Sequence, residues 1–174
     1  MRVHRTFAFV DLSGFTAFTD ARGDTEASQL LAGFRACVRE IASDYGVRVA
    51  KWLGDGAMLV GVDDRALVAA VLDLASRVDE SDSPLAVRIG VSGGDVIVFE
   101  GDDYIGGAVN LAARLCAVAE PGEILATLDA AAVAPEDCDA TRVGPRVIPG
   151  LAHPVPLVRL VPPLGEATLA AEQQ

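Results

Sequence analysis

Two aspartates in this sequence stand where a carboxylate could bind a metal ion. Asp11 follows the apolar run 6–10 and precedes the small-residue turn Ser13-Gly14. A carboxylate at the end of a buried strand suits a hard cation, and the amides of a following helix suit phosphate oxygens. Asp55 lies in an Asp-Gly step between two β-prone runs, which predicts a hairpin with this residue at its tip. Two such carboxylates can share two ions, which activate an attacking oxygen and neutralise phosphates.

Each aspartate also has a plainer interpretation. Taken alone, Asp11 is more often a helix cap and Asp55 more often a turn residue. We expect the neighbourhoods of the two residues to pair in parallel, which would bring Asp55 beside Asp11. That proximity favours the metal site.

Other polar residues could act with them. Asn110 and Arg114 lie four residues apart in 108–119, a segment with helical periodicity, so both face the same way and could reach one ligand. Arg114 is otherwise an exposed helix arginine. Lys51, the only lysine, lies on a predicted strand, and Asp103 lies in a loop.

The elements that must position these residues follow in a regular order. We predict one long helix over 15–45, with Asp24 or Thr25 as its cap, and further helices over 64–79 and 108–119. Strands are predicted over 6–10, 47–52, 57–62, 85–91 and 96–99, the last two separated at Gly93-Gly94. This β-α-β-β-α-β order indicates an α+β, ferredoxin-like fold with its helices on one face of an antiparallel sheet. The other face is expected to meet a partner or solvent.

The C-terminal part of the chain has weaker signals. After residue 122 only short strand-like pieces interrupted by prolines follow, which we interpret as additional C-terminal strands. We expect one catalytic domain over residues 1–161 and a loosely ordered tail over 162–174.

Charge and composition limit the partners. The net charge of −11 argues against nucleic acid or an anionic membrane, so an anionic ligand must be held by metal ions, a helix N-terminus or a few placed cations. Three cysteines without CxxC spacing indicate neither disulfides nor zinc. Without a signal peptide or a membrane-length apolar run, we expect a cytoplasmic protein.

Three motifs follow one another along the chain: Asp11-Leu-Ser-Gly-Phe-Thr16, Lys51-Trp-Leu-Gly-Asp-Gly56 and Tyr104-Ile-Gly-Gly-Ala-Val-Asn110-Leu-Ala-Ala-Arg114. In this order they resemble the class III adenylate and guanylate cyclase catalytic domain, in its bacterial adenylate type. The resemblance covers about residues 5–160 and implies conversion of ATP into 3′,5′-cyclic AMP and pyrophosphate.

The resemblance implies a role for each site residue. Asp11, Leu12 and Asp55 would hold two divalent ions, Mg²⁺ or Mn²⁺. Lys51 and Asp103 would read adenine, which favours ATP over GTP. Asn110 would orient the ribose, and Arg114 would stabilise charge on the α-phosphate. The terminal phosphates would contact residues of the first motif and one strand arginine: Gly14, Phe15, Thr16 and Arg88.

The resemblance also implies a homodimer and exposes one departure. In this family the metal aspartates come from one protomer and the other site residues from its partner, so we expect a head-to-tail C2 dimer with two interface sites. Relatives often carry a phosphate-binding lysine near the segment corresponding to 147–153, where this chain has none. The metals, Arg88, the amides of 14–16 or Arg146 would have to replace it, and we predict weak ATP affinity.

Three alternatives remain in view. A catalytically weak or inactive cyclase-like nucleotide-binding regulatory module would explain the motifs without chemistry, although the complete residue set argues against it. A diguanylate cyclase is suggested by Gly93-Gly94-Asp95, but Val96 and Ile97 follow where that signature needs an acidic and an aromatic residue. A purely structural dimerisation domain leaves the ordered motifs unexplained.

Overall fold

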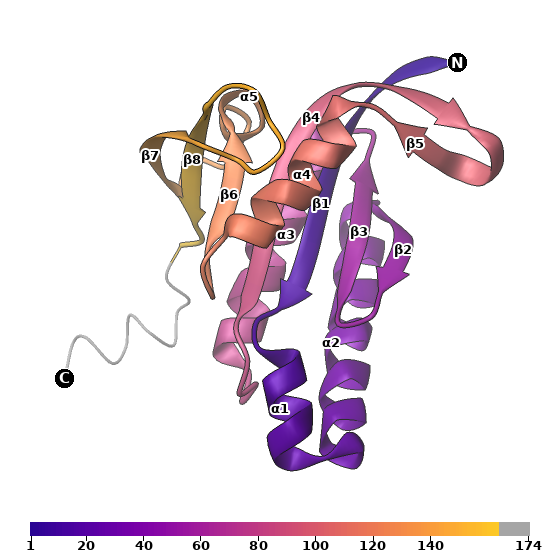
Figure 1. Cartoon of the computed structure of the whole chain (residues 1–174), viewed down its shortest axis with the longest axis vertical. Coiled ribbons are helices and arrows are strands. Elements are labelled where there is room, and N and C mark those ends of the chain that lie inside the picture. The colour runs from indigo at the N-terminus through magenta and orange to yellow at the C-terminus, as the bar shows by residue number, and fades with distance from the viewer. Residues whose placement is uncertain (164–174) are drawn as a thin grey trace.

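The sheet is organised around β1 (Arg2–Leu12), which is paired along both sides (Figure 1). The computed structural model describes residues 1–163. β1 runs antiparallel to β3 (Gly56–Gly61) and to β4 (Val87–Phe99). Its side chains alternate between two apolar clusters, with Ala8 and Val10 in one and Phe7 in the other. This period of two buries the strand on both faces.

The other strands complete an eight-stranded sheet in the described part of the chain. The order is β2-β3-β1-β4-β6-β8-β7, with β5 paired to β4. The order β2-β3-β1-β4 confirms the ferredoxin-like core and the α+β class, and β6, β7 and β8 are the additional C-terminal strands. The bounds of the strands not yet given are Arg48–Leu53 (β2), Asp103–Ile105 (β5), Ile124–Thr127 (β6), Asp139–Arg146 (β7) and Val155–Val161 (β8).

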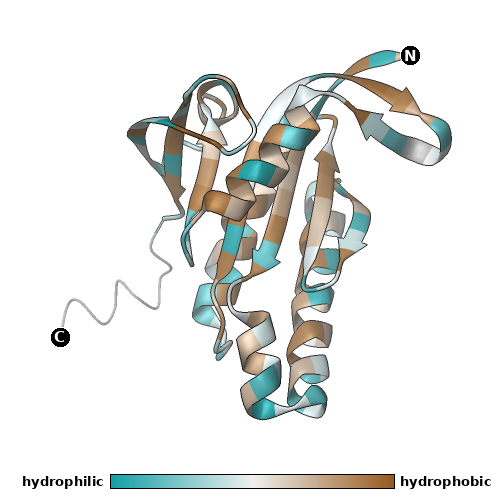
Figure 2. Cartoon of the chain, viewed as in Figure 1, coloured by the Kyte–Doolittle hydropathy of each residue, from teal (hydrophilic) through white to brown (hydrophobic). Residues whose placement is uncertain are grey.

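Helices cover both faces of the sheet, so the prediction of one covered face is wrong. α2 (Asp24–Tyr45) and α3 (Asp64–Glu80) pack behind the sheet as drawn in Figure 1, and α4 (Gly107–Val118) lies in front of it. Figure 2 shows the hydrophobic colouring of β3 between these layers. A Cβ at Gly90 of β4 would lie 2.3 Å from the Ala112 carbonyl oxygen, so the missing side chain lets α4 rest on the strand backbone.

The predicted single helix over 15–45 is two helices. α1 (Phe15–Arg22) and α2 are separated by Gly23, whose φ of 89° is outside the helical range. Neither Asp24 nor Thr25 is the cap, because Gly23 occupies the N-cap position of α2 without a side-chain hydrogen bond. The apolar periodicity that predicted the helix lies in residues 30–41, beyond the break, so it did not reveal the break.

The two predicted strands at 85–91 and 96–99 are one strand, β4. Gly93 and Gly94 do not turn the chain but pair with Thr6 and Arg5 of β1. A Cβ on Gly94 would lie 3.2 Å from the Cβ of Ala108, so this glycine marks the close approach of α4. The same residue type serves a turn and a tight contact, and the sequence does not distinguish them.

The remaining short elements are η1 (Glu100–Asp102) and α5 (Leu128–Ala131). Of the tail predicted over 162–174, residues 164–174 lie outside the described residues, so its order stays a prediction, as does the domain boundary at 161. All three cysteines are free, which agrees with the absence of disulfides. None of the helices in residues 1–163 has the length and apolar character that a membrane span requires.

Candidate active site

The two aspartates lie together where β1 and β3 meet. Asp11 is opposite Gly56 of β3 and opposite Arg88 of β4. The Leu12 amide donates a hydrogen bond to the Asp55 carbonyl oxygen at 3.2 Å, which places the β2–β3 turn beside the end of β1. The strands are antiparallel, so the expected parallel pairing is wrong. The proximity holds because the antiparallel register pairs Asp11 with Gly56, the residue that follows Asp55.

In this corner, made of Asp11, Asp55 and Arg88, a single guanidinium does not balance two carboxylates. Arg88 Nη2 contacts Asp11 Oδ2 at 2.5 Å, and the two side chains are 28% and 24% exposed. The other oxygen, Asp11 Oδ1, is buried without a hydrogen-bond partner among the described residues. Burial raises the pKa of Asp55, and the Asp11 carboxylate raises it further. One guanidinium therefore faces two carboxylates and leaves one acceptor unsatisfied.

These residues fit a divalent cation. An orphaned carboxylate oxygen beside a second carboxylate is the donor chemistry that Mg²⁺ and Mn²⁺ prefer, usually completed by water and substrate phosphates. Cys116 of α4 lies close, donating its thiol to the Arg88 carbonyl at 3.5 Å. Burial and the Asp11 charge raise the pKa of this thiol to about 12. In residues 1–163 no group of three or more His, Cys, Asp or Glu side chains is arranged for a metal.

The start of α1 adjoins this corner. Gly14 is the N-cap residue, with a φ of 78°, and no side chain caps the helix. The first amides of a helix have no partner within it, so those of Phe15 and Thr16 remain available to an anion. Phe15 packs its ring against the main core, which fixes the helix relative to β1.

Lys51 and Asp103 form a second group. Lys51 Nζ lies 2.6 Å from Asp103 Oδ1, and both side chains are about half exposed. Neighbouring contacts join β5 to β2 and β1: Arg48 of β2 donates to the Tyr104 hydroxyl at 2.8 Å, and the Tyr104 ring meets Phe7 of β1 edge-on at 5.3 Å. The strands thus hold an exposed cation and anion side by side.

Asn110 and Arg114 form a third group on α4. Asn110 is exposed, whereas Arg114 is partly buried and donates through Nη1 to the Pro149 carbonyl. Pro149 belongs to the turn 147–150 that follows β7, within the segment 147–153 that lacks the expected phosphate-binding lysine. Arg146, suggested as its replacement, is instead paired with Glu123 at 3.2 Å.

The three groups are separate within one chain. In residues 1–163, none of the four residues of the second and third groups makes a hydrogen bond or ion pair with Asp11 or Asp55: Lys51, Asp103, Asn110 and Arg114.

Sequence reasoning missed a residue that supports Asp55. Arg35 of α2 donates to the Gly54 carbonyl at 2.9 Å, and its guanidinium lies 5.1 Å from the centre of the Trp52 ring. It therefore holds the turn that carries Asp55. The sequence shows only that Arg35 lies in an amphipathic helix, and that pattern does not identify the Gly54 carbonyl as its partner.

Comparisons with known proteins give a family. Residues 4–155 match the family model described as the adenylate and guanylate cyclase catalytic domain. A pH-sensitive adenylate cyclase of Mycobacterium tuberculosis is 33% identical over 161 residues, or 89% of this chain and 40% of the relative. An uncharacterized protein of the same species is 40% identical over 147 residues, or 84% of this chain and 38% of the relative. The chain spans about two fifths of the length of these relatives.

Solved structures share the fold. The adenylyl cyclase CyaB from P. aeruginosa aligns with a TM-score of 0.80 at 27% identity, covering 95% of this chain and 98% of that one. An adenylate cyclase from Trypanosoma brucei, solved in its monomeric state, aligns with a TM-score of 0.78 at 25% identity, covering 90% and 89%.

Proposed function

The chain belongs to the adenylate and guanylate cyclase catalytic domain family, and from this premise we propose that it converts ATP into 3′,5′-cyclic AMP and pyrophosphate. The observation that carries the proposal is the corner of Asp11 and Asp55, with its unpartnered buried oxygen. A structural carboxylate is normally neutralised by its own chain, and this pair is not. This shortage of positive charge supports a site that receives cations from solution.

Two divalent ions, Mg²⁺ or Mn²⁺, would be held by Asp11, Asp55 and the Leu12 backbone. When bound, they lower the pKa of the ribose 3′-hydroxyl for attack on the α-phosphate and neutralise the departing pyrophosphate. Arg88, which now contacts Asp11, would be released from it and would contact the terminal phosphates. The α1 amides of Phe15 and Thr16 supply neutral donors to the same oxygens.

The pair of Lys51 and Asp103 supports adenine as the base. Adenine presents an acceptor at N1 beside a donor, its 6-amino group, and guanine presents the reverse pattern on the same edge. An ammonium and a carboxylate 2.6 Å apart match the first pattern and leave unpaired polar groups against the second. We therefore propose ATP rather than GTP as the substrate.

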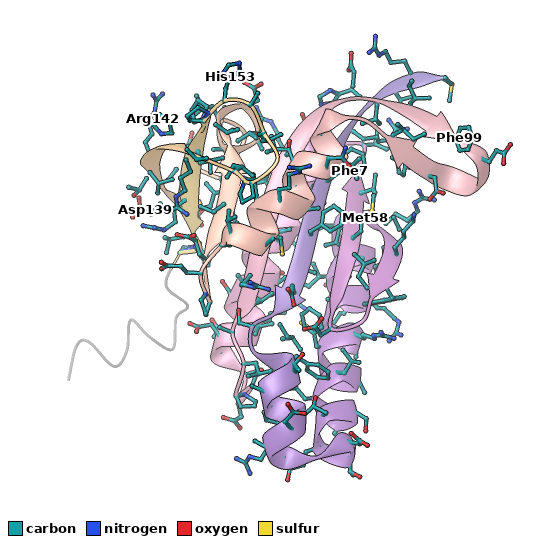
Figure 3. All side chains as sticks on the ribbon, viewed as in Figure 1. Phe7, Met58, Phe99, Asp139, Arg142 and His153 are labelled. Carbon is teal, nitrogen blue, oxygen red and sulfur yellow. The ribbon has the colours of Figure 1, made fainter. Side chains whose placement is uncertain are left out.

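Exposed apolar residues near the second and third groups support a homodimer with C2 symmetry. The β4–β5 arm carries exposed apolar side chains, among them Phe99, which Figure 3 shows well away from α4. Val147, in the turn near Arg114, is 78% exposed. A second copy would cover these residues and bring Asn110 and Arg114 to the aspartates of its partner.

The first test assays product from ATP and from GTP with each metal ion. We expect cyclic AMP from ATP, loss of it in Asp55→Ala, and near-normal activity in Asp20→Ala, which removes an exposed carboxylate of α1. No cyclic AMP from the unmodified chain would contradict the proposal. ATP binding without product would favour the nucleotide-binding regulatory module instead.

A second test addresses the divided site. Asp55→Ala chains and Arg114→Ala chains, each inactive alone, are mixed in equal amounts. Random exchange makes half of the dimers mixed, each with one intact site of two, so activity should return to about a quarter of the unmodified level. No recovery, with exchange verified by tagged chains, would contradict the shared site.

A further inference from the structure

The turn between β7 and β8 is fixed directly against α4. Ile148 is buried in an apolar cluster with Leu115 and Ala119 of α4 and its flank. The next residue, Pro149, accepts the hydrogen bond from Arg114 Nη1. Since Leu115 adjoins Arg114, the cluster and the hydrogen bond hold the turn and the arginine in one arrangement.

Gly150 closes this arrangement, and a side chain here would have to displace the Arg114 guanidinium. A Cβ at this position would lie 1.9 Å from Arg114 Nη1 and 2.9 Å from its Cζ. The guanidinium therefore lies directly on the backbone of the turn. Gly144 of β7 provides a comparison, because its φ of 75° is close to the 85° of Gly150 while nothing lies within 4 Å of its Cβ position. Backbone strain alone would affect both glycines, and contact with Arg114 affects one.

We propose that Gly150 is a positioning residue for Arg114, holding the guanidinium in the place it needs for the reaction. This inference rests on the proposed cyclase function. One N–H of the guanidinium is used on Pro149, which leaves its other donors for the nucleotide. A cation fixed before the reaction needs no reorganisation when charge develops on the α-phosphate. The segment that lacks the expected lysine thus contributes through its backbone, by orienting an arginine.

The kinetic test compares Gly150→Ala with Gly144→Ala. We expect Gly150→Ala to lower kcat about 10- to 100-fold with the KM for ATP changed less than about twofold, because a small displacement of a reacting-centre group acts on the transition state. Gly144→Ala should keep kcat within about twofold, with a comparable loss of thermal stability. In an Arg114→Ala background, Gly150→Ala should have little further effect, because its target is absent.

A spectroscopic readout separates this inference from the proposed function. The ¹⁵N signals of the Arg114 guanidinium, assigned by their loss in Arg114→Ala, should show slow rotation about Cζ–Nη in the unmodified chain and in Gly144→Ala. Rotation should be fast in Gly150→Ala. Unchanged signals and kcat in Gly150→Ala, or a higher kcat, would overturn the proposal. An inactive unmodified chain would contradict the cyclase function, and the signals would still decide whether Gly150 holds the guanidinium.

Discussion

Two acidic sites on opposite sides of β4, Glu123 beside β6 and the Asp11 corner beside β1, are treated in opposite ways by this chain. Glu123, at the start of β6, accepts a hydrogen bond from the Ile89 amide, one residue beyond Arg88. Its side chain is 4% exposed, with one oxygen bonded to Arg146 and the other to Arg159 at 2.6 Å. Burial opposes its ionisation, but the hydrogen bonds from the two arginines outweigh burial and lower its pKa.

At the Asp11 corner the balance is reversed. Two carboxylates share Arg88, one oxygen has no partner, and burial together with the Asp11 charge raises the pKa of Asp55. The comparison teaches that the chain neutralises Glu123 with its own arginines but does not neutralise the corner. A bound cation, as in the proposed function, would restore the balance of charge there.

The largest effect is expected for Asp55→Asn. Cyclase activity should fall by at least about a hundredfold, because a charged ligand at the reacting centre is lost. In the presence of a chelator the variant should be more thermally stable than the unmodified chain, because the repulsion with Asp11 disappears. Mn²⁺ should raise the melting temperature of the unmodified chain only. A variant that is less stable without metal would contradict the imbalance.

Glu123→Gln should show the opposite behaviour. We expect a loss of about 2 kcal/mol in unfolding free energy at neutral pH, below the range for fully buried pairs because both arginines are partly exposed. The lowered pKa of Glu123 means that its stabilisation is complete above the unfolded-state pKa. It is lost as pH falls through the folded-state pKa, so the difference between variant and unmodified chain should shrink in acid. Chemical denaturation at a series of pH values measures this difference in unfolding free energy.

Arg88→Gln removes the one guanidinium that contacts Asp11 and so increases the shortage of positive charge at the corner. Without the guanidinium competing for Asp11, Mn²⁺ should bind the nucleotide-free chain about tenfold more tightly, or ~1.4 kcal/mol. The KM for ATP should rise, because a phosphate contact is lost. Arg159→Gln is the control, since it removes an arginine from Glu123 and should leave Mn²⁺ affinity unchanged. Titration calorimetry measures the Mn²⁺ affinity of both variants. Weaker Mn²⁺ binding in Arg88→Gln would contradict the competition between Arg88 and the metal ion for Asp11.

The smallest effect concerns the support of Asp55. Arg35→Ala removes the hydrogen bond to Gly54 and should weaken Mn²⁺ binding severalfold, or ~1 kcal/mol. Arg39 lies at the same 5.1 Å from the Trp52 ring centre, and no hydrogen bond from it to Gly54 is present in residues 1–163. Arg39→Ala should therefore leave Mn²⁺ binding unchanged. Equal effects would assign the support to the ring contact instead.

Local patterns account for what could be predicted. The helix over 64–79, the hairpin around Asp55 and the ferredoxin-like order were correct, because periodicity and turn residues act over a few positions. The same patterns misread Gly23 as helix and Gly93-Gly94 as a turn. A glycine's role depends on what lies across from it, and in β4 that is α4.

By itself, the sequence determined the residue types of the site, their order and the elements that carry them. Only the tertiary structure decided the partners: Arg88 beside Asp11, Arg114 on Pro149, and two arginines on Glu123. The residues of each of these contacts lie more than twenty positions apart, and no local pattern encodes such a pairing. The balance of charge depends on these long-range partners, so it became visible only once the sheet had brought them together.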